Sequence, residues 1–393
     1  MLSFDFCSPT RFIFGEGVEA RVGDIARGLG LDRLLIQYGG GSVLRSGLLD
    51  RVKASLDAAG IAYVEIGGVV PNPRLSLVRQ AIALGQAEAV DGVLAVGGGS
   101  VIDSCKATAV GLANPDKDVW GFYNGTHASP ANVLPVLVVP TIPAAGSEGS
   151  ASSVITNEEN GMKRGLGSDA TRPRAAFINP TLCATLPREQ IANGAADIFA
   201  HIMERYFTNT PEVDITDRLC EAAMGSILRN ASLVYENPAD AAAWAEVFWT
   251  STIAHNNSLG VGRDQDWACH QIEHELSGRY DVAHGAGLAA IIPSWMRYVL
   301  KQDMTRFVRF AVNVMHAEMD FFHPERTALE GIARLEQWFA SLDLATTLGG
   351  LNIDDTYLTE MAQKVKKTNG DGTLGRFVIL RPDDVEAILR NAL

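Results

Sequence analysis

The first half of the chain alternates short apolar runs with amphipathic segments. Residues 34–38, 62–66, 92–96 and 133–139 are apolar runs of strand length. The segments after the first two runs repeat apolar residues at steps of three and four, which places one apolar stripe on each predicted helix. This alternation predicts β-α-β units and a parallel sheet. A Ser8–Pro9 turn between two short alternating segments predicts a β-hairpin over residues 4–15.

The second half has a different pattern. After Leu186 and Pro187 the chain shows long helical periodicities and no convincing strand, which places a domain boundary between residues 180 and 188. We therefore predict an α/β domain over residues 1–184 and an all-α domain over residues 185–393. A length of 393 residues agrees with two domains.

Charge and cysteine content narrow the functional classes. The chain has 33 Lys and Arg against 46 Asp and Glu, a formal charge of -13, which disfavours nucleic acid or an anionic membrane as a partner. Its 5 cysteines are scattered without C-x-x-C spacing, so neither a disulfide framework nor a thiolate metal cluster is expected. The N-terminus has no signal-peptide pattern, and we expect a cytoplasmic protein without a membrane span.

One glycine run follows the strand predicted over residues 92–96. Gly97, Gly98 and Gly99 lead into Ser100 and Asp103 at the start of a helix. Backbone N–H groups there, with the helix N-terminus, can bind a pyrophosphate. The spacing matches neither G-x-G-x-x-G nor a Walker loop. The alternative is a tight β-α turn that binds nothing.

A second glycine run, residues 39–41 followed by Ser42, ends the strand over residues 34–38. NAD enzymes often place an acidic residue near this point to bind the ribose 2′-OH, and this stretch has no carboxylate. Gly40, Gly41 and Ser42 could instead accept a 2′-phosphate, which favours NADP(H) over NAD(H). A flexible turn without a ligand is the alternative here.

Histidines and one aspartate have the spacing of metal ligands. Asp197 and His201 are four residues apart, as are His270 and His274, so each pair shares one helix face; His284 follows shortly after. One carboxylate and several imidazoles suit divalent Zn or Fe(II). Any of these histidines could instead be an ordinary buried residue. Spacing does not decide which four of the five donors bind metal, and the fifth could transfer protons.

These segments together resemble the iron-containing (group III) alcohol dehydrogenase family, especially its butanol dehydrogenase-like, NADPH-dependent aldehyde reductase branch. The resemblance extends over nearly the whole chain. It rests on the segments 14–17, 38–42, 71–73, 97–103, 140–148 and 266–287, all in the family's order.

The resemblance implies a dehydroquinate synthase-like fold, with a Rossmann-like N-terminal domain, an all-α C-terminal domain and an active site in the cleft between them. It implies Asp197, His201, His270 and His284 as metal ligands and His274 as a proton-relay candidate. The implied cofactor-binding residues are Gly97, Gly98, Gly99, Ser100, Asp103, Thr141, Ser147 and Lys163. Many members have Asp-Pro where this chain has Asn179-Pro180.

The expected reaction is reversible hydride transfer between NADP(H) and an aldehyde or primary alcohol, assisted by Fe(II) or Zn, in a homodimer formed through the N-terminal hairpin. A dehydroquinate synthase-like lyase or cyclase would share the fold, but it should have several basic residues near the cleft for its substrate, whereas residues 264–287 supply only Arg279. Glycerol dehydrogenase-like polyol oxidation is another alternative. A protein with a purely structural metal would more commonly use cysteine ligands.

Overall fold

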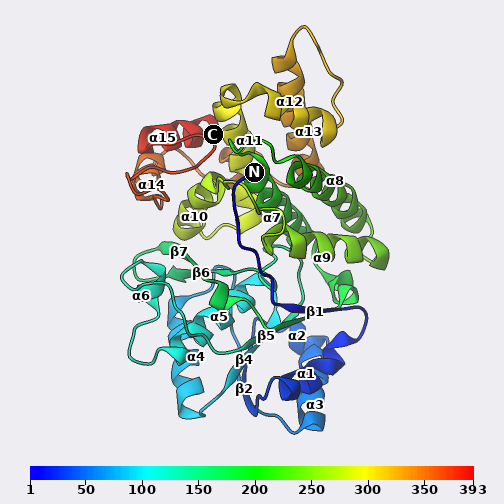
Figure 1. Cartoon of the computed structure of the whole chain (residues 1–393), viewed down its shortest axis with the longest axis vertical. Helices are drawn as coiled ribbons and strands as arrows, with labels where there is room; N and C mark the ends of the chain where they lie inside the picture. Colours follow the sequence, from blue (N-terminus) through cyan, green and yellow to red (C-terminus); the bar gives the residue numbers. More distant parts are fainter. The chain divides into compact units, whose positions relative to one another are not determined.

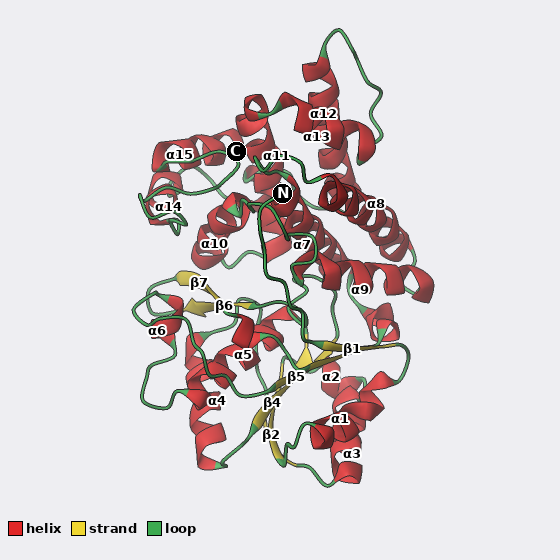
Figure 2. Cartoon of the chain, viewed as in Figure 1, coloured by secondary structure: helices red, strands yellow, loops and turns green.

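Six parallel strands form the main sheet of the first half of the chain in the computed structural model, which describes residues 1–393 (Figures 1 and 2). Their order across the sheet is β1-β8-β5-β4-β2-β3. The strands are β1 (Arg11–Phe14), β2 (Arg33–Tyr38), β3 (Ala62–Ile66), β4 (Gly92–Gly97), β5 (Val136–Pro140) and β8 (Ala175–Ile178). The parallel sheet and the four predicted strands are confirmed, because buried parallel strands are apolar on both faces and so stand out in the sequence.

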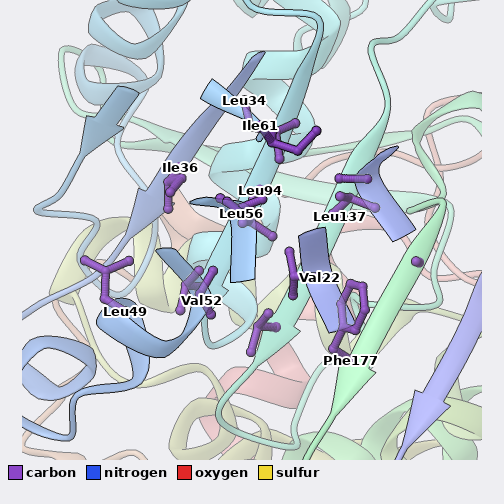
Figure 3. Packing of buried hydrophobic residues seen from close by; sticks show 14 of the residues in the cluster. Val22, Leu34, Ile36, Leu49, Val52, Leu56, Ile61, Leu94, Leu137 and Phe177 are labelled. Atoms are coloured by element: carbon purple, nitrogen blue, oxygen red, sulfur yellow. The ribbon is translucent and has the colours of Figure 1, made fainter. Parts of the chain in front are cut away.

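Helices cover both faces of this sheet. They are α1 (Val22–Gly28), α2 (Ser42–Arg45), α3 (Leu48–Ala59), α4 (Leu75–Ala87), α5 (Gly99–Ala113) and α6 (Trp120–Tyr123). Leu34 and Ile36 of β2 pack with Val52 of α3 in one apolar cluster, shown in Figure 3. Leu35, between them, packs with Ala81 of α4 on the opposite face. The alternation of side chains along a strand thus produces three layers.

The predicted N-terminal hairpin is wrong. Residues 11–14 form the single strand β1, and β1 pairs in parallel with β8, with Arg11 opposite Ala175. Residues 4–10 form no strand. The antiparallel hairpin of this half lies elsewhere, in β6 (Ser152–Asn157) and β7 (Met162–Gly167). The local alternation at residues 4–15 did not reveal a strand partner that lies far along the chain.

The second half is helical, as predicted. Its helices are α7 (Arg188–Tyr206), α8 (Asp214–Glu236), α9 (Ala241–His255), α10 (Ala268–Tyr280), α11 (His284–Val299), α12 (Met304–Asn313), α13 (Pro324–Ser341), α14 (Leu358–Lys364) and α15 (Pro382–Asn391). Helix α7 packs against α8, α9, α10 and α11. Its buried face therefore lies at the centre of the helical unit. None of the helices has the length and apolar character needed to cross a membrane.

The two compact units meet in the sequence between Thr185 and Leu186. Residues Met1–Phe6 are grouped with the helical unit and not with the sheet. The Met1 amino group donates to the carbonyl of Pro211 at 3.0 Å, and the Leu2 amide donates to the carbonyl of Gly262 at 2.8 Å. The predicted bounds of 1–184 and 185–393 therefore differ from this division at residue 185 and at residues 1–6.

Candidate functional site

Helix α7 supplies the carboxylate around which the histidines gather. Asp197 and His201 lie one turn apart and both are buried. Nδ1 of His201 lies 2.9 Å from the Asp197 carbonyl oxygen and 3.0 Å from Asp197 Oδ1. Nδ1 carries at most one proton for these two oxygens, and Oδ1 is buried without a hydrogen-bond partner. A buried carboxylate oxygen in this state is costly unless a cation occupies the space beside it.

Helices α10 and α11 bring two further imidazoles to the same oxygen. Nε2 of His270 lies 3.8 Å from Asp197 Oδ1, and Nε2 of His284 lies 3.7 Å from it. His270 Nε2 is also buried without a hydrogen-bond partner. The structure thus brings together all four residues that the resemblance implies as ligands. One carboxylate and three imidazoles, without a thiolate, fit a divalent metal of the Zn or Fe(II) type.

The electrostatics of the cluster suit a cation. Burial by itself would raise the pKa of Asp197, but the imidazoles of His201 and His284, with His270, hold it well below its ordinary value. Asp197 is therefore ionised. Burial lowers the pKa of His201 to about 4, which keeps this imidazole neutral, as a metal ligand must be. At His270 burial acts in the same direction, but Asp197 and Glu204 outweigh it and raise the pKa to about 9.

A glycine lets His284 approach α7. His284 is the first residue of α11, and Gly285 follows it. A Cβ atom at position 285 would lie 2.0 Å from the carbonyl oxygen of Asn193, a backbone atom of α7 that cannot move aside easily. The absence of a side chain at Gly285 therefore sets the distance between α11 and α7, and with it the position of His284.

His274 lies one turn after His270, and its ring centroid is 5.6 Å from that of His284. Possible ligand atoms form two close groups, each within 4.8 Å: Asp197, His201 and His270 in one, Glu273, His274 and His284 in the other. His284 belongs to the second group, and its Nε2, 3.7 Å from Asp197 Oδ1, connects that group to the first. His274 therefore lies beside the expected metal position, next to His284.

Several residues around the histidines were missed by sequence reasoning. The carboxylates of Glu204 and Glu273 contact Nδ1 of His270 and of His284, respectively. His255 lies with its ring centroid 4.1 Å from that of His201, and Trp267 lies 5.1 Å from that of His270. Glu204 had a detectable signal, because it follows Asp197 by seven residues and shares its helix face. No sequence pattern pointed to His255 or Trp267.

The two glycine runs lie at neighbouring strand ends in the sheet unit. Residues 39–41 follow β2, residues 97–99 run from the last residue of β4 to the first of α5, and these two strands are paired in parallel. The chain reverses its direction across the sheet between β2 and β4, and open α/β sheets bind ligands at such a point. A Cβ atom at Gly39 would lie 3.5 Å from Cγ2 of Val101, so the first run packs against the helix that follows the second.

None of these loop glycines has a positive φ angle. Close packing explains them instead, since a Cβ atom at Gly98 would lie 3.1 Å from Cδ1 of Ile142. Ser100 lies in the first turn of α5, and the Thr141 amide donates to the Gly97 carbonyl at 3.1 Å. The segment after β5 therefore forms one side of the second glycine run.

The other expected cofactor residues belong to a buried polar network. Asp103 accepts hydrogen bonds from Ser147 Oγ at 2.7 Å and from the Val154 amide at 2.8 Å. Burial raises its pKa, against the effect of the nearby Lys106 ammonium. Lys163 lies buried on β7. In this structure the Asp103 side chain therefore connects α5 to Ser147 and to β6 through hydrogen bonds.

Comparison with known proteins covers the whole chain. The model of the family "Iron-containing alcohol dehydrogenase" matches residues 9–180, and that of "Fe-containing alcohol dehydrogenase family, C-terminal" matches residues 191–393. NADH-dependent butanol dehydrogenase A of Clostridium acetobutylicum is 37% identical over 390 residues, 99% of this chain and 98% of that protein. The NADPH-dependent aldehyde reductase YqhD of Escherichia coli is 31% identical over 369 residues, covering 93% and 94%.

Two solved structures agree with these sequence matches. The crystal structure of NADH-dependent butanol dehydrogenase A from Thermotoga maritima superposes with a TM-score of 0.95 at 37% identity, over 100% of this chain and 99% of that one. The E. coli YqhD structure superposes with a TM-score of 0.93 at 30% identity, over 100% and 99%. Both similarities extend over the sheet unit and the helical unit.

Proposed function

The chain belongs to the iron-containing alcohol dehydrogenase family, and on this premise we propose that it catalyses reversible hydride transfer between NADP(H) and an aldehyde or primary alcohol. The observation that carries the proposal is the convergence of three imidazoles on Asp197 Oδ1. We place a divalent metal, Fe(II) or Zn, between these four side chains. A bound metal would polarise the substrate oxygen as a Lewis acid, and reduced nicotinamide would supply the hydride.

The chain's own residues have three tasks in this reaction. Asp197 provides the negative charge of the metal site, and the three imidazoles complete a donor set that leaves room for a substrate oxygen. His274 is positioned beside His284 to move a proton to or from the alcohol oxygen, directly or through water. The backbone N–H groups of residues 97–99 and the N-terminus of α5 are suited to hold the cofactor's phosphates.

The choice of NADP(H) rests on the first glycine run. No carboxylate lies between Tyr38 and Arg45. A Cβ atom at Gly41 would lie 2.6 Å from Nη1 of Arg45, so a guanidinium extends over this loop. A positive charge beside a carboxylate-free loop favours a 2′-phosphate. The relatives at 37% identity are named NADH-dependent and the one at 31% NADPH-dependent, so the names alone do not decide the cofactor.

The proposal also includes a homodimer in a reducing compartment such as the cytoplasm. Strand β1 is the terminal strand of the sheet, and Phe14 on it is 42% exposed, which favours contact with a second copy. All five cysteines are free thiols. Light scattering of the purified protein would test the dimer, with Phe14→Glu as the variant expected to dissociate it.

The activity is tested by following absorbance at 340 nm with NADPH and butyraldehyde, before and after removal of metal. We expect turnover that is lost with the metal and restored by Fe(II) or Zn. Absence of turnover over a panel of aldehydes and alcohols, in protein that holds stoichiometric metal, would contradict the proposed reaction and favour the lyase alternative.

A further inference from the structure

Two fully buried carboxylates lie behind the candidate metal ligands. Neither Glu204 nor Glu273 has any exposed side-chain area. They come from different helices, α7 and α10, and each contacts a different histidine. Fully buried carboxylates are rare unless a hydrogen-bond donor, a positive charge or a metal ion pairs with them.

Glu204 is attached to His270 at two atoms. Its Oε1 lies 3.1 Å from Nδ1 of the ring and accepts the backbone N–H of the same residue at 3.0 Å. The backbone bond fixes the first turn of α10, and the ring bond fixes the rotation of the imidazole within that turn. Glu204 thereby connects α7, the helix of Asp197, to the residue that must face Asp197.

Glu273 acts in the same way on His284. Its Oε2 contacts Nδ1 of His284, while its Oε1 contacts the hydroxyl of Ser277. Both oxygens of the carboxylate therefore have a partner, which holds the carboxylate in place. Glu273 connects α10 to the first residue of α11.

The two contacts have a common consequence. A carboxylate beside Nδ1 accepts a hydrogen bond from Nδ1–H, so the ring proton stays on Nδ1 and Nε2 is the nitrogen with a free lone pair. In both histidines Nε2 is the atom that faces Asp197 Oδ1. The structure assigns Glu204 and Glu273 as positioning residues that hold His270 and His284 with Nε2 directed at the metal.

This assignment rests on the proposed metal site. Asp197, Glu204 and Glu273 also place three carboxylates around the imidazoles, and a divalent cation would offset part of this negative charge. Carboxylates that hydrogen-bond metal-binding histidines typically change metal affinity by roughly tenfold to hundredfold. Both glutamates should therefore affect metal binding even though neither contacts the metal.

The test compares zinc affinity in the wild type, Glu204→Gln and Glu273→Gln, measured by competition with a chromophoric chelator. Each substitution preserves side-chain size and removes the charge. Glu221→Gln is the control, because Glu221 is a partly buried carboxylate of the same unit that contacts Tyr206 and Arg309 and no histidine. We expect the Kd for zinc to rise about tenfold or more in both test variants and to stay within threefold in the control.

A second measurement needs no variant. In zinc-loaded wild type with ¹⁵N-labelled histidine, long-range ¹H–¹⁵N correlations should show Nδ1–H on His270 and His284. Nε2–H on either ring would overturn the assignment for that residue, as would a glutamine variant that binds zinc like the wild type. If the wild type itself does not bind zinc, the proposed metal site fails. Zinc binding that is normal in both variants refutes this inference and leaves the proposed function intact.

Discussion

Nζ of Lys106 lies 2.9 Å from Oγ of Ser147, deep in the sheet unit. The same ammonium group donates to the carbonyls of Ser150 at 3.0 Å and Ser152 at 2.8 Å. Ser147 in turn donates to Asp103, which is three residues before Lys106 on α5. One buried side chain thus fixes the segment after β5 to the helix that follows the second glycine run.

Replacing this lysine should destabilise the protein. Lys106→Met fills a similar volume but leaves several buried oxygens without a donor, at about 1–3 kcal/mol for each group that water cannot reach. We expect a lower midpoint in urea unfolding. Lys53→Met, at a partly exposed ion pair with Glu65, is the control and should change the free energy of unfolding by less than about 1 kcal/mol.

The same residue predicts a pH dependence. Burial lowers the pKa of Lys106 to about 8, although Asp103 and Glu148 act to raise it. The folded protein therefore releases this proton at a lower pH than the unfolded chain, whose lysine has a pKa of about 10.4. Between these values the unfolded state binds more protons, so stability rises with pH. The wild type should gain stability relative to Lys106→Met from pH 8 to 10, and a constant difference would contradict this.

Two histidine variants separate metal binding from proton transfer. His270→Ala removes one of the four proposed ligands, so metal and activity should be lost together. His274→Ala should retain near-stoichiometric metal while kcat falls by roughly 10²- to 10⁴-fold. Measuring the metal content and the kcat of both variants shows which histidine binds metal and which transfers protons. A metal-free His274→Ala beside a metal-replete His270→Ala would exchange the two roles.

The cofactor preference should depend on Arg45. Arg45→Ala removes the guanidinium over the first glycine run, so kcat/KM with NADPH should fall about tenfold while that with NADH changes little, which corresponds to about 1.4 kcal/mol of binding to the 2′-phosphate. Gly41→Asp should reduce NADPH use further through charge repulsion. Equal kcat/KM for the two cofactors in the wild type would argue against NADP(H).

Gly285 offers a steric test of the metal site. In Gly285→Ala the new Cβ atom would meet the Asn193 carbonyl oxygen at 2.0 Å, so α11 must shift and carry His284 with it. We expect a loss of about 1–3 kcal/mol from overpacking together with weaker zinc binding. Gly225→Ala in α8, where a Cβ atom meets nothing within 4 Å, should instead stabilise by about 0.5–1 kcal/mol. If Gly285→Ala binds zinc as tightly as the wild type, the prediction that α11 packing controls the metal site is wrong.

Patterns of neighbouring residues predicted the secondary-structure elements that depend on those residues alone. The strands at residues 62–66 and 92–97 and the helical second half follow from hydrophobic runs and periodicity. The partner of β1 does not, because Arg11 and Ala175 are distant in sequence and nothing near Arg11 records their pairing.

Some residues of the candidate site could likewise be predicted from local sequence patterns, and others could not. Asp197 and His201 were found because one turn of helix separates them. Glu273 was overlooked although it lies beside His274, because its role depends on α11 bringing His284 to it. A contact between two helices has no signature within either one.

The grouping of residues Met1–Phe6 with the helical unit has a consequence for how the protein is made. These residues precede the sheet unit in the chain, yet the hydrogen bond of Met1 to Pro211 joins positions 210 apart. Their binding surface, which includes Gly262, is synthesised only after the sheet unit is complete. Residues 1–6 are therefore synthesised before the sheet unit but can reach their native contacts only after it, and a helical fragment expressed from residue 186 onward would lack them.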